Sequence, residues 1–80
     1  MSANQLSYNP LYLQVKDIIQ KRILEGDYRP GASIPSEARL AKDFGTSVST
    51  IRQALSILVA EGKLVKKQGS GTFVSEQKVE

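Results

Sequence analysis

A short, glycine-centred break between two helical segments leaves few folds open to this chain. The first segment follows Ser36, which can cap a helix, and it stops at Gly45, a residue that tolerates left-handed backbone. Ser47 can cap the second segment, and Gly62 marks its end. Two helices joined by about three or four residues around a glycine cross steeply, as in a helix-turn-helix. We therefore predict this motif, with its second helix over residues 47–61.

A further amphipathic helix is predicted ahead of this pair. Asn9 can cap it, and Gly26 stops it near Glu25. The chain is then extended at Ile34, because Pro35 disfavours helical dihedrals in the residue before it. Apolar residues recur in each helix at spacings of three and four, which predicts one buried face per helix. These faces comprise Leu11, Val15, Ile18, Ile19, Ile23 and Leu24, then Leu40, Ala41 and Phe44, then Ile51, Ala54, Leu55 and Leu58.

A β-hairpin is predicted after the last helix. Residues 63–68 and 72–75 have the composition of two short strands, and the turn between them is Gly69, Ser70 and Gly71. The fold class is therefore mainly α with a small β-hairpin. We predict a winged helix-turn-helix, with three helices and a C-terminal two-stranded wing.

The pattern of apolar residues also sets the expected domain boundaries. Residues 10–75 form the winged helix-turn-helix domain, because the periodic apolar positions lie within them. Residues 1–9 are expected to be a disordered arm, and residues 76–80 a frayed tail or the start of a linker.

Composition excludes several classes of function. The chain has 80 residues, which suffices for one small domain, and it contains no cysteine and no histidine. Serine and lysine nucleophiles lack a paired base, and the glycines do not form a phosphate-binding loop. We therefore expect no enzyme activity, no metal and no cofactor. No segment has the roughly 20 apolar residues of a membrane span and no signal peptide is recognisable, so a cytoplasmic location is expected.

Positive charge is concentrated late in the chain. The net charge is +3, which alone is weak evidence for a nucleic-acid partner. From Lys63 to Ser75, however, there are three lysines and no acidic residue. Lys66 and Lys67 beside the hairpin turn can follow a phosphate backbone, although exposed lysines also serve solubility alone. The glycines of the turn permit a narrow tip that fits a minor groove or a sugar-phosphate strand.

The outward face of helix 47–61 is small and polar. Projection at about 100° per residue sets Ser49, Gln53, Ser56 and Ala60 opposite the apolar face, with Arg52 beside them. Such a face can enter a major groove, where Arg and Gln read base edges, although most polar helix faces are merely solvated. The expected DNA-binding residues, including hydroxyls near helix N-termini, are Ser36, Arg39, Ser47, Val48, Ser49, Thr50, Arg52, Gln53, Lys66, Lys67, Gln68, Gly69, Ser70, Gly71 and Thr72.

An ordered set of motifs between residues 10 and 74 resembles the N-terminal domain of GntR-family transcription regulators. The set comprises Pro10-Leu11-Tyr12, Gly26, Pro30-Gly31, Ile34-Pro35-Ser36-Glu37, Leu40-Ala41, Gly45-Thr46-Ser47, Thr50-Ile51-Arg52-Gln53-Ala54-Leu55, Glu61-Gly62 and Gly69-Ser70-Gly71-Thr72-Phe73-Val74. The Pro-Leu-Tyr opening is most similar to the HutC or YtrA branches. The resemblance implies a bacterial homodimer that binds a palindromic operator in double-stranded DNA, with a separate C-terminal domain that senses a small-molecule effector.

Two positions depart from the pattern of that family. The family usually has arginines that contact guanines immediately after the glutamate of Pro-Ser-Glu and after the serine that opens the recognition helix. This chain has Ala38 and Val48 there, whereas Arg52 matches a retained family arginine. Our hypotheses are that Arg39, one position later, substitutes in part for the first, and that Val48 contacts a thymine methyl group.

Two other classes of partner compete with this interpretation. Winged helices also act as protein-interaction modules, and the depletion of base-reading arginines leaves that alternative open. RNA or single-stranded DNA binding has less support, because it needs exposed aromatic side chains for stacking. Here the aromatic residues are assigned to the core or its margins, and they are Tyr8, Tyr12, Tyr28, Phe44 and Phe73.

Overall fold

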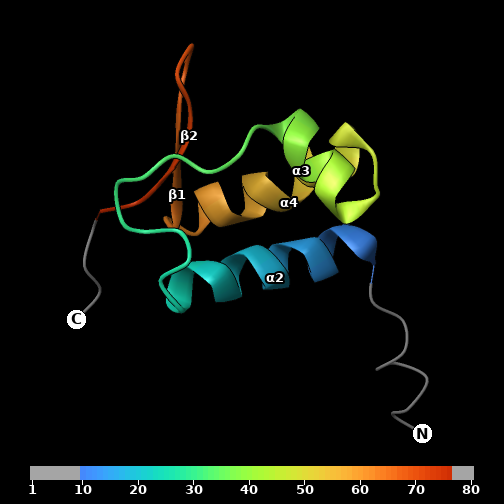
Figure 1. Cartoon of the computed structure of the whole chain (residues 1–80), viewed down its shortest axis with the longest axis horizontal. Helices are drawn as coiled ribbons and strands as arrows, with labels where there is room; N and C mark the ends of the chain where they lie inside the picture. Colours follow the sequence, from blue (N-terminus) through green and yellow to red (C-terminus); the bar gives the residue numbers. More distant parts are fainter. Residues whose placement is uncertain (1–9, 77–80) are drawn as a thin grey trace, which may run out of the picture.

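Three helices and a two-stranded antiparallel sheet make up the part of the chain that the structure, a computed structural model, describes, residues 10–76 (Figure 1). The elements are α2 (Leu11–Leu24), α3 (Glu37–Phe44), α4 (Val48–Ala60), β1 (Leu64–Lys67) and β2 (Gly71–Val74). The predicted winged helix-turn-helix is confirmed. The arm expected over 1–9, with the Asn9 cap and Tyr8, and residues 77–80 of the expected tail lie outside the described residues.

The two helices of the motif begin at the predicted caps. Ser36 Oγ accepts a hydrogen bond of 3.1 Å from the backbone N–H of Arg39, and Ser47 Oγ accepts one of 3.1 Å from that of Thr50. Each bond satisfies an N–H group that the helix leaves without a carbonyl partner. Gly45 ends α3 with φ of 67° and bonds back to Ala41 and Lys42, so the chain reverses within three residues before α4 begins at Val48.

Replacing Gly45 is expected to weaken this turn. Because Gly45 has φ of 67°, Gly45→Ala should lower the free energy of unfolding by about 1–2 kcal/mol, measured by urea denaturation. A Cβ added to Gly45 would meet no atom within 4 Å beyond its chain neighbours, so the cost comes from backbone strain and not from a clash. Gly45→Asn is the matched control, because Asn tolerates left-handed backbone, and it should lose clearly less. An equal loss in both variants would contradict this explanation.

The core lies where α2 and α4 pack together and meet the base of the wing. Its largest fully buried side chains are Val15, Ile19, Leu40, Ile51, Leu58 and Leu64. Tyr12, Tyr28 and Phe44 are partly buried against this cluster, in agreement with their expected assignment to the core margins.

The buried face of α2 is narrower than predicted. Val15 and Ile19 are buried, but Leu11, Ile18 and Leu24 are 49%, 42% and 77% exposed. The prediction that all six apolar residues form one buried stripe is therefore wrong. Within the described residues α2 packs mainly against one helix, α4, and a single neighbour covers only part of a helix surface.

The wing is tied to the segment that leads into α3. β1 and β2 pair with Leu64 opposite Val74 and Lys67 opposite Gly71. Compared with the prediction, β1 is one residue shorter at each end, and β2 begins and ends one residue earlier. On its other edge β2 pairs with the 31–34 segment: Ile34 N–H donates to Thr72 O at 2.9 Å, and Val74 N–H donates to Ala32 O at 2.8 Å. Figure 1 shows this segment crossing beside the hairpin on its way to α3. These bonds fix the position of the wing relative to the start of α3.

Candidate nucleic-acid interface

A groove runs between the wing and the start of α3. It has a volume of about 720 Å³ and is lined by residues 33–38 on one side and 66–72 on the other. A smaller hollow of about 130 Å³ lies between the wing and α4, and it shares Glu37, Lys66 and Thr72 with the larger groove. Together they form one surface, here called the wing groove, bordered by α3, α4 and the hairpin.

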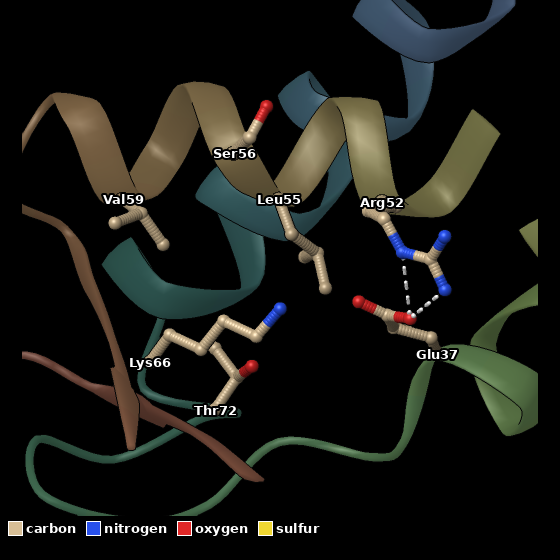
Figure 2. A pocket seen from close by; sticks show the side chains of 7 residues that line it. All are labelled: Glu37, Arg52, Leu55, Ser56, Val59, Lys66 and Thr72. Atoms are coloured by element: carbon tan, nitrogen blue, oxygen red, sulfur yellow. Dashed lines mark hydrogen bonds and ion pairs between the residues drawn. The ribbon is translucent and has the colours of Figure 1, made fainter. Parts of the chain in front are cut away.

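Side chains from three elements point into the smaller part of the wing groove. In Figure 2, Leu55 and Val59 extend from α4 toward Lys66 and Thr72 of the hairpin, and Arg52 extends toward Glu37 of α3. The charged residues among those that line the wing groove are Arg52, Lys66, Lys67 and Glu37. Three cations and one carboxylate give this surface a net positive charge, which favours an anionic partner.

The outward face of α4 is exposed as its sequence predicts. Ser49, Arg52, Gln53 and Ser56 are all exposed, and the arginine side chain is 62% accessible. Ser56 Oγ donates to the backbone carbonyl of Gln53 at 2.9 Å, so its hydroxyl is turned onto its own helix. The face has short side chains around one long cation, a shape that can approach base edges closely.

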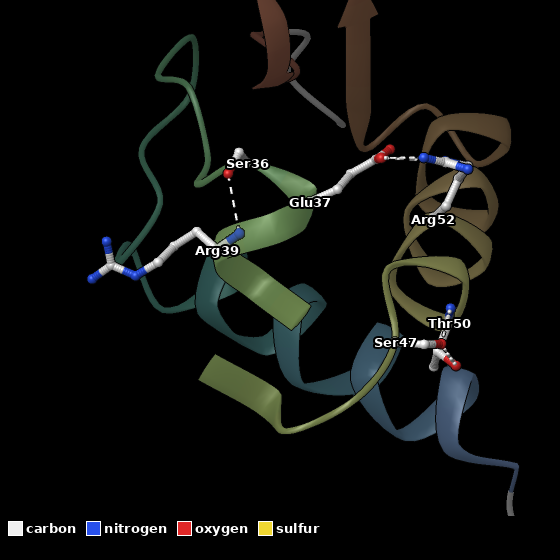
Figure 3. Close-up of polar contacts among 6 residues, drawn as sticks. All are labelled: Ser36, Glu37, Arg39, Ser47, Thr50 and Arg52. Atoms are coloured by element: carbon white, nitrogen blue, oxygen red, sulfur yellow. Dashed lines mark hydrogen bonds and ion pairs between the residues drawn. The ribbon is translucent and has the colours of Figure 1, made fainter. Parts of the chain in front are cut away.

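Arg52 is held by an acidic residue of the neighbouring helix. Its Nε and Nη2 donate to Glu37 Oε1 at 3.2 and 2.9 Å (Figures 2 and 3). Glu37 also lies in the first turn of α3, where a carboxylate complements the helix dipole. The two residues are 15 positions apart on different helices, so no local pattern in the sequence signals this pair.

The hydroxyls expected to contact phosphates lie at two separate places. Ser36 lines the wing groove, and its Oγ caps α3. Ser47 and Thr50 lie at the opposite end of α4 from the wing, and their hydroxyl oxygens are 3.0 Å apart (Figure 3). A serine that caps a helix through its oxygen keeps its O–H proton for donation, so Ser36 can still donate to a phosphate oxygen.

The wing contributes two lysines and the residues of its turn to the wing groove. Lys66 lies on the face of the hairpin that turns toward α4, whereas Lys67 Nζ lies 4.8 Å from the centre of the Phe73 ring. The turn comprises Gln68, Gly69 and Ser70. Gly71 was predicted to belong to the turn but is the first residue of β2. This tip is exposed, and within it the Ser70 N–H donates to Lys67 O at 2.9 Å.

The positions that depart from the family pattern differ in their surroundings. Ala38 lines the wing groove, whereas Arg39 extends away from Arg52 and pairs with Asp43 at 3.3 Å (Figure 3). The geometry therefore gives no support to the hypothesis that Arg39 substitutes for an arginine at position 38. Val48 is half-buried and packs against the core, which gives it a structural role.

Two further observations on residues 10–76 concern metal binding and membrane spanning. These residues contain no group of three or more acidic side chains close enough to hold a metal ion. None of the helices in this range combines the length and the apolar character needed to cross a bilayer.

Relatives of this chain include transcriptional repressors. It is 44% identical over 80 residues to the HTH-type transcriptional repressor NagR of Bacillus subtilis, covering all of this chain and 33% of the relative. It is 51% identical over 69 residues to the histidine utilization repressor of Klebsiella aerogenes, covering 86% of this chain and 29% of the relative. The chain thus spans about a third of the length of these curated relatives. The histidine utilization repressor agrees with the expected similarity to the HutC branch.

Solved structures with the same fold include domains bound to DNA. The DNA-binding domain of AraR in complex with operator ORR3 superimposes with a TM-score of 0.82 at 44% identity, covering 85% of this chain and 82% of that one. A GntR family transcriptional regulator from Listeria monocytogenes gives a TM-score of 0.84 at 26% identity, covering 86% of this chain and 60% of that one. The family model described as bacterial regulatory proteins, gntR family, matches residues 11–74, most of the sequence. This chain therefore belongs to the gntR family of bacterial regulatory proteins.

Proposed function

We propose that this domain binds double-stranded DNA in a sequence-specific manner as the DNA-reading part of a bacterial transcription regulator. In this proposal α4 enters the major groove, and the wing, residues 63–75, lies at the minor groove or along the backbone. The observation that carries the proposal is the wing groove itself, where Arg52 of α4 and Lys66 of the hairpin face the same space. The operator complexes of AraR, a protein of the same fold and 44% identity, support it.

We propose further contacts for the same arrangement. Ser49 and Gln53 on α4 supply hydrogen-bonding groups for base edges, and Ser36 and the exposed turn of the wing supply O–H and N–H donors for phosphates. Ser47 and Thr50 would approach the backbone at the start of α4, and Thr72 would do so from β2. Val48 would contact a thymine methyl group.

Salt dependence tests this proposal against a protein-interaction role. Titration of a mixed-sequence duplex with the 80-residue chain should give weaker association as the salt is raised from about 50 to 200 mM. The loss should be roughly 3.5-fold for each phosphate that the protein neutralises. A nearly flat response, or no association at low salt, would contradict DNA binding and favour the protein-interaction module.

Lys66 is expected to contribute one phosphate contact. Lys66→Ala should lower the slope of log K against log salt by about 0.9, because one fewer counterion is released. Lys21→Ala is the matched control: Lys21 is an exposed lysine in the last turn of α2, and its loss changes the net charge equally. Equal slopes of log K against log salt for the two variants would show that Lys66 makes no phosphate contact.

For the whole regulator we propose a wider role that rests on the family. Two copies would bind a palindromic operator together, and a separate domain would sense a small-molecule effector. The relatives are about three times the length of this chain, which leaves room for such a domain in them. A regulator of this kind acts in the cytoplasm and carries no enzyme activity, since its output is occupancy of DNA.

A further inference from the structure

We propose that Glu37 is a positioning residue for base recognition: it fixes the guanidinium of Arg52 so that the free edge of that group meets a guanine. This inference rests on the proposed DNA-binding function. It adds a specificity-determining role for an acidic side chain at a surface whose other charged lining residues are cations.

The two hydrogen bonds of the pair use one side of the guanidinium. Glu37 Oε1 accepts from Nε and from Nη2 of Arg52, at 3.2 and 2.9 Å, and these donors lie along the same edge. An arginine carries five N–H donors in a rigid plane. The two bonds to Glu37 do not use the two N–H groups of Nη1 or the second N–H of Nη2. One N–H of Nη1 and one of Nη2 therefore point outward in parallel from the end of the guanidinium. Guanine O6 and N7 accept two parallel donors in the major groove.

The carboxylate is the anchored partner of the two. Glu37 is the first residue of α3, directly after the capping Ser36 and three residues before the fully buried Leu40. Its side chain is 25% accessible, whereas that of Arg52 is 62% accessible. A long, exposed cation loses much rotamer freedom when it binds, and a fixed acceptor reduces that loss in advance. Glu37 thus connects the start of α3 to the orientation of the Arg52 side chain.

Removal of the Glu37 charge distinguishes two roles for this residue, positioning the Arg52 side chain or only neutralising its charge. A carboxylate near phosphates repels them, so its removal should strengthen binding to unrelated duplex. If Glu37 only masked Arg52, its removal would strengthen binding to the preferred duplex as well, with base preference unchanged. If it positions Arg52, base preference at one site should fall while binding to unrelated duplex stays equal or rises.

Selection from a pool of duplexes with a randomised central segment supplies the test. The wild-type chain and Arg52→Ala are compared first, and the G·C pair whose preference disappears in Arg52→Ala marks the base that Arg52 reads. Competition titrations with duplexes that differ at this pair then measure discrimination for Glu37→Ala and Glu37→Gln. Glu61→Ala is the matched control, because it removes an equally charged residue whose partner is Lys63 at 3.1 Å, outside the wing groove.

The expected result is a loss confined to one base pair. Glu37→Ala should lower discrimination there by roughly threefold or more, of the size that an exposed ion pair contributes, without weakening binding to unrelated duplex. Glu37→Gln should lie between wild type and Glu37→Ala, because the amide oxygen still accepts from Arg52. Glu61→Ala should leave discrimination unchanged. Circular dichroism checks whether each variant is folded. If Glu37→Ala folds poorly, Glu37→Gln still provides the test.

Other outcomes would overturn the inference in distinguishable ways. Unchanged discrimination in both Glu37 variants, with Arg52→Ala still losing its base, would reject positioning and leave the proposed function intact. A changed preference at a neighbouring C·G pair instead would make Glu37 itself the reader, since a carboxylate can accept from cytosine N4. If the wild-type chain selects no sequence, or if Arg52→Ala alters no position, the proposed role of Arg52 fails and the inference fails with it.

Discussion

Leu58→Ala should remove a large fraction of the stability of this domain. Leu58 is fully buried, and truncation of a buried leucine costs about 2–5 kcal/mol, partly through the cavity that remains. A domain of 80 residues has a total stability of about 4–12 kcal/mol, and small domains lie near the lower end. The loss is therefore a large fraction of the whole. Urea denaturation followed by far-ultraviolet circular dichroism measures it.

The adjacent Val59 provides the control for this substitution. Val59 is on the same helix but is 36% exposed, at the edge of the wing groove. Val59→Ala should cost less than about 1 kcal/mol, because its side chain has far fewer contacts to lose. A loss in Leu58→Ala no greater than that in Val59→Ala would mean that Leu58 does not face the core and that α4 is rotated about its axis.

Local chemistry made the helix-turn-helix predictable. Ser36, Gly45 and Ser47 each act through bonds or dihedrals within about four residues of themselves, so their roles can be inferred without knowledge of the fold. The outward face of α4 was predictable for a similar reason, because helical periodicity alone separates Ile51 and Leu58 from Gln53. These predictions are confirmed in their positions, whereas contact with DNA stays a prediction.

Features that depend on a distant partner were not predictable. The exposure of Leu11, Ile18 and Leu24 follows from how much of α2 its neighbours cover, and the sequence of α2 does not contain that information. The pairing of residues 31–34 with β2 could not be inferred either, because such a short extended segment has no strand-like alternation.

The same reasoning applies within the candidate site. Arg52 and Glu37 meet because α3 and α4 pack together, and neither segment alone indicates the contact. The direction of the Arg39 side chain likewise depends on its position in the helix. Successive helical residues point about 100° apart, so a shift of one residue from Ala38 turns the side chain away from the wing groove. Asp43, one turn later, then provides its partner.

Ser49→Glu is expected to change stability and DNA binding in opposite directions. Ser49 is exposed in the first turn of α4, which contains no acidic residue. A carboxylate there complements the N-terminal end of the helix dipole and should raise the free energy of unfolding by about 0.3–1 kcal/mol. On the proposed binding surface, the same charge meets phosphates and base acceptors, and its repulsion should weaken duplex association by at least about tenfold. Urea denaturation and a duplex titration at about 0.1 M salt, where the Debye length is about 10 Å, measure the two effects on one preparation.

Gln20→Glu separates the local effect from that of net charge. Gln20 lies on α2, beside a different hollow of about 210 Å³ lined by Gly62 and Ser75, and its substitution changes the net charge of the chain equally. Because salt screens distant charges, this variant should bind duplex within about twofold of wild type. Similar losses in the two variants would mean that overall charge governs association. Unchanged binding in Ser49→Glu would remove the N-terminal half of α4 from the interface, and with it the proposed reading of the major groove.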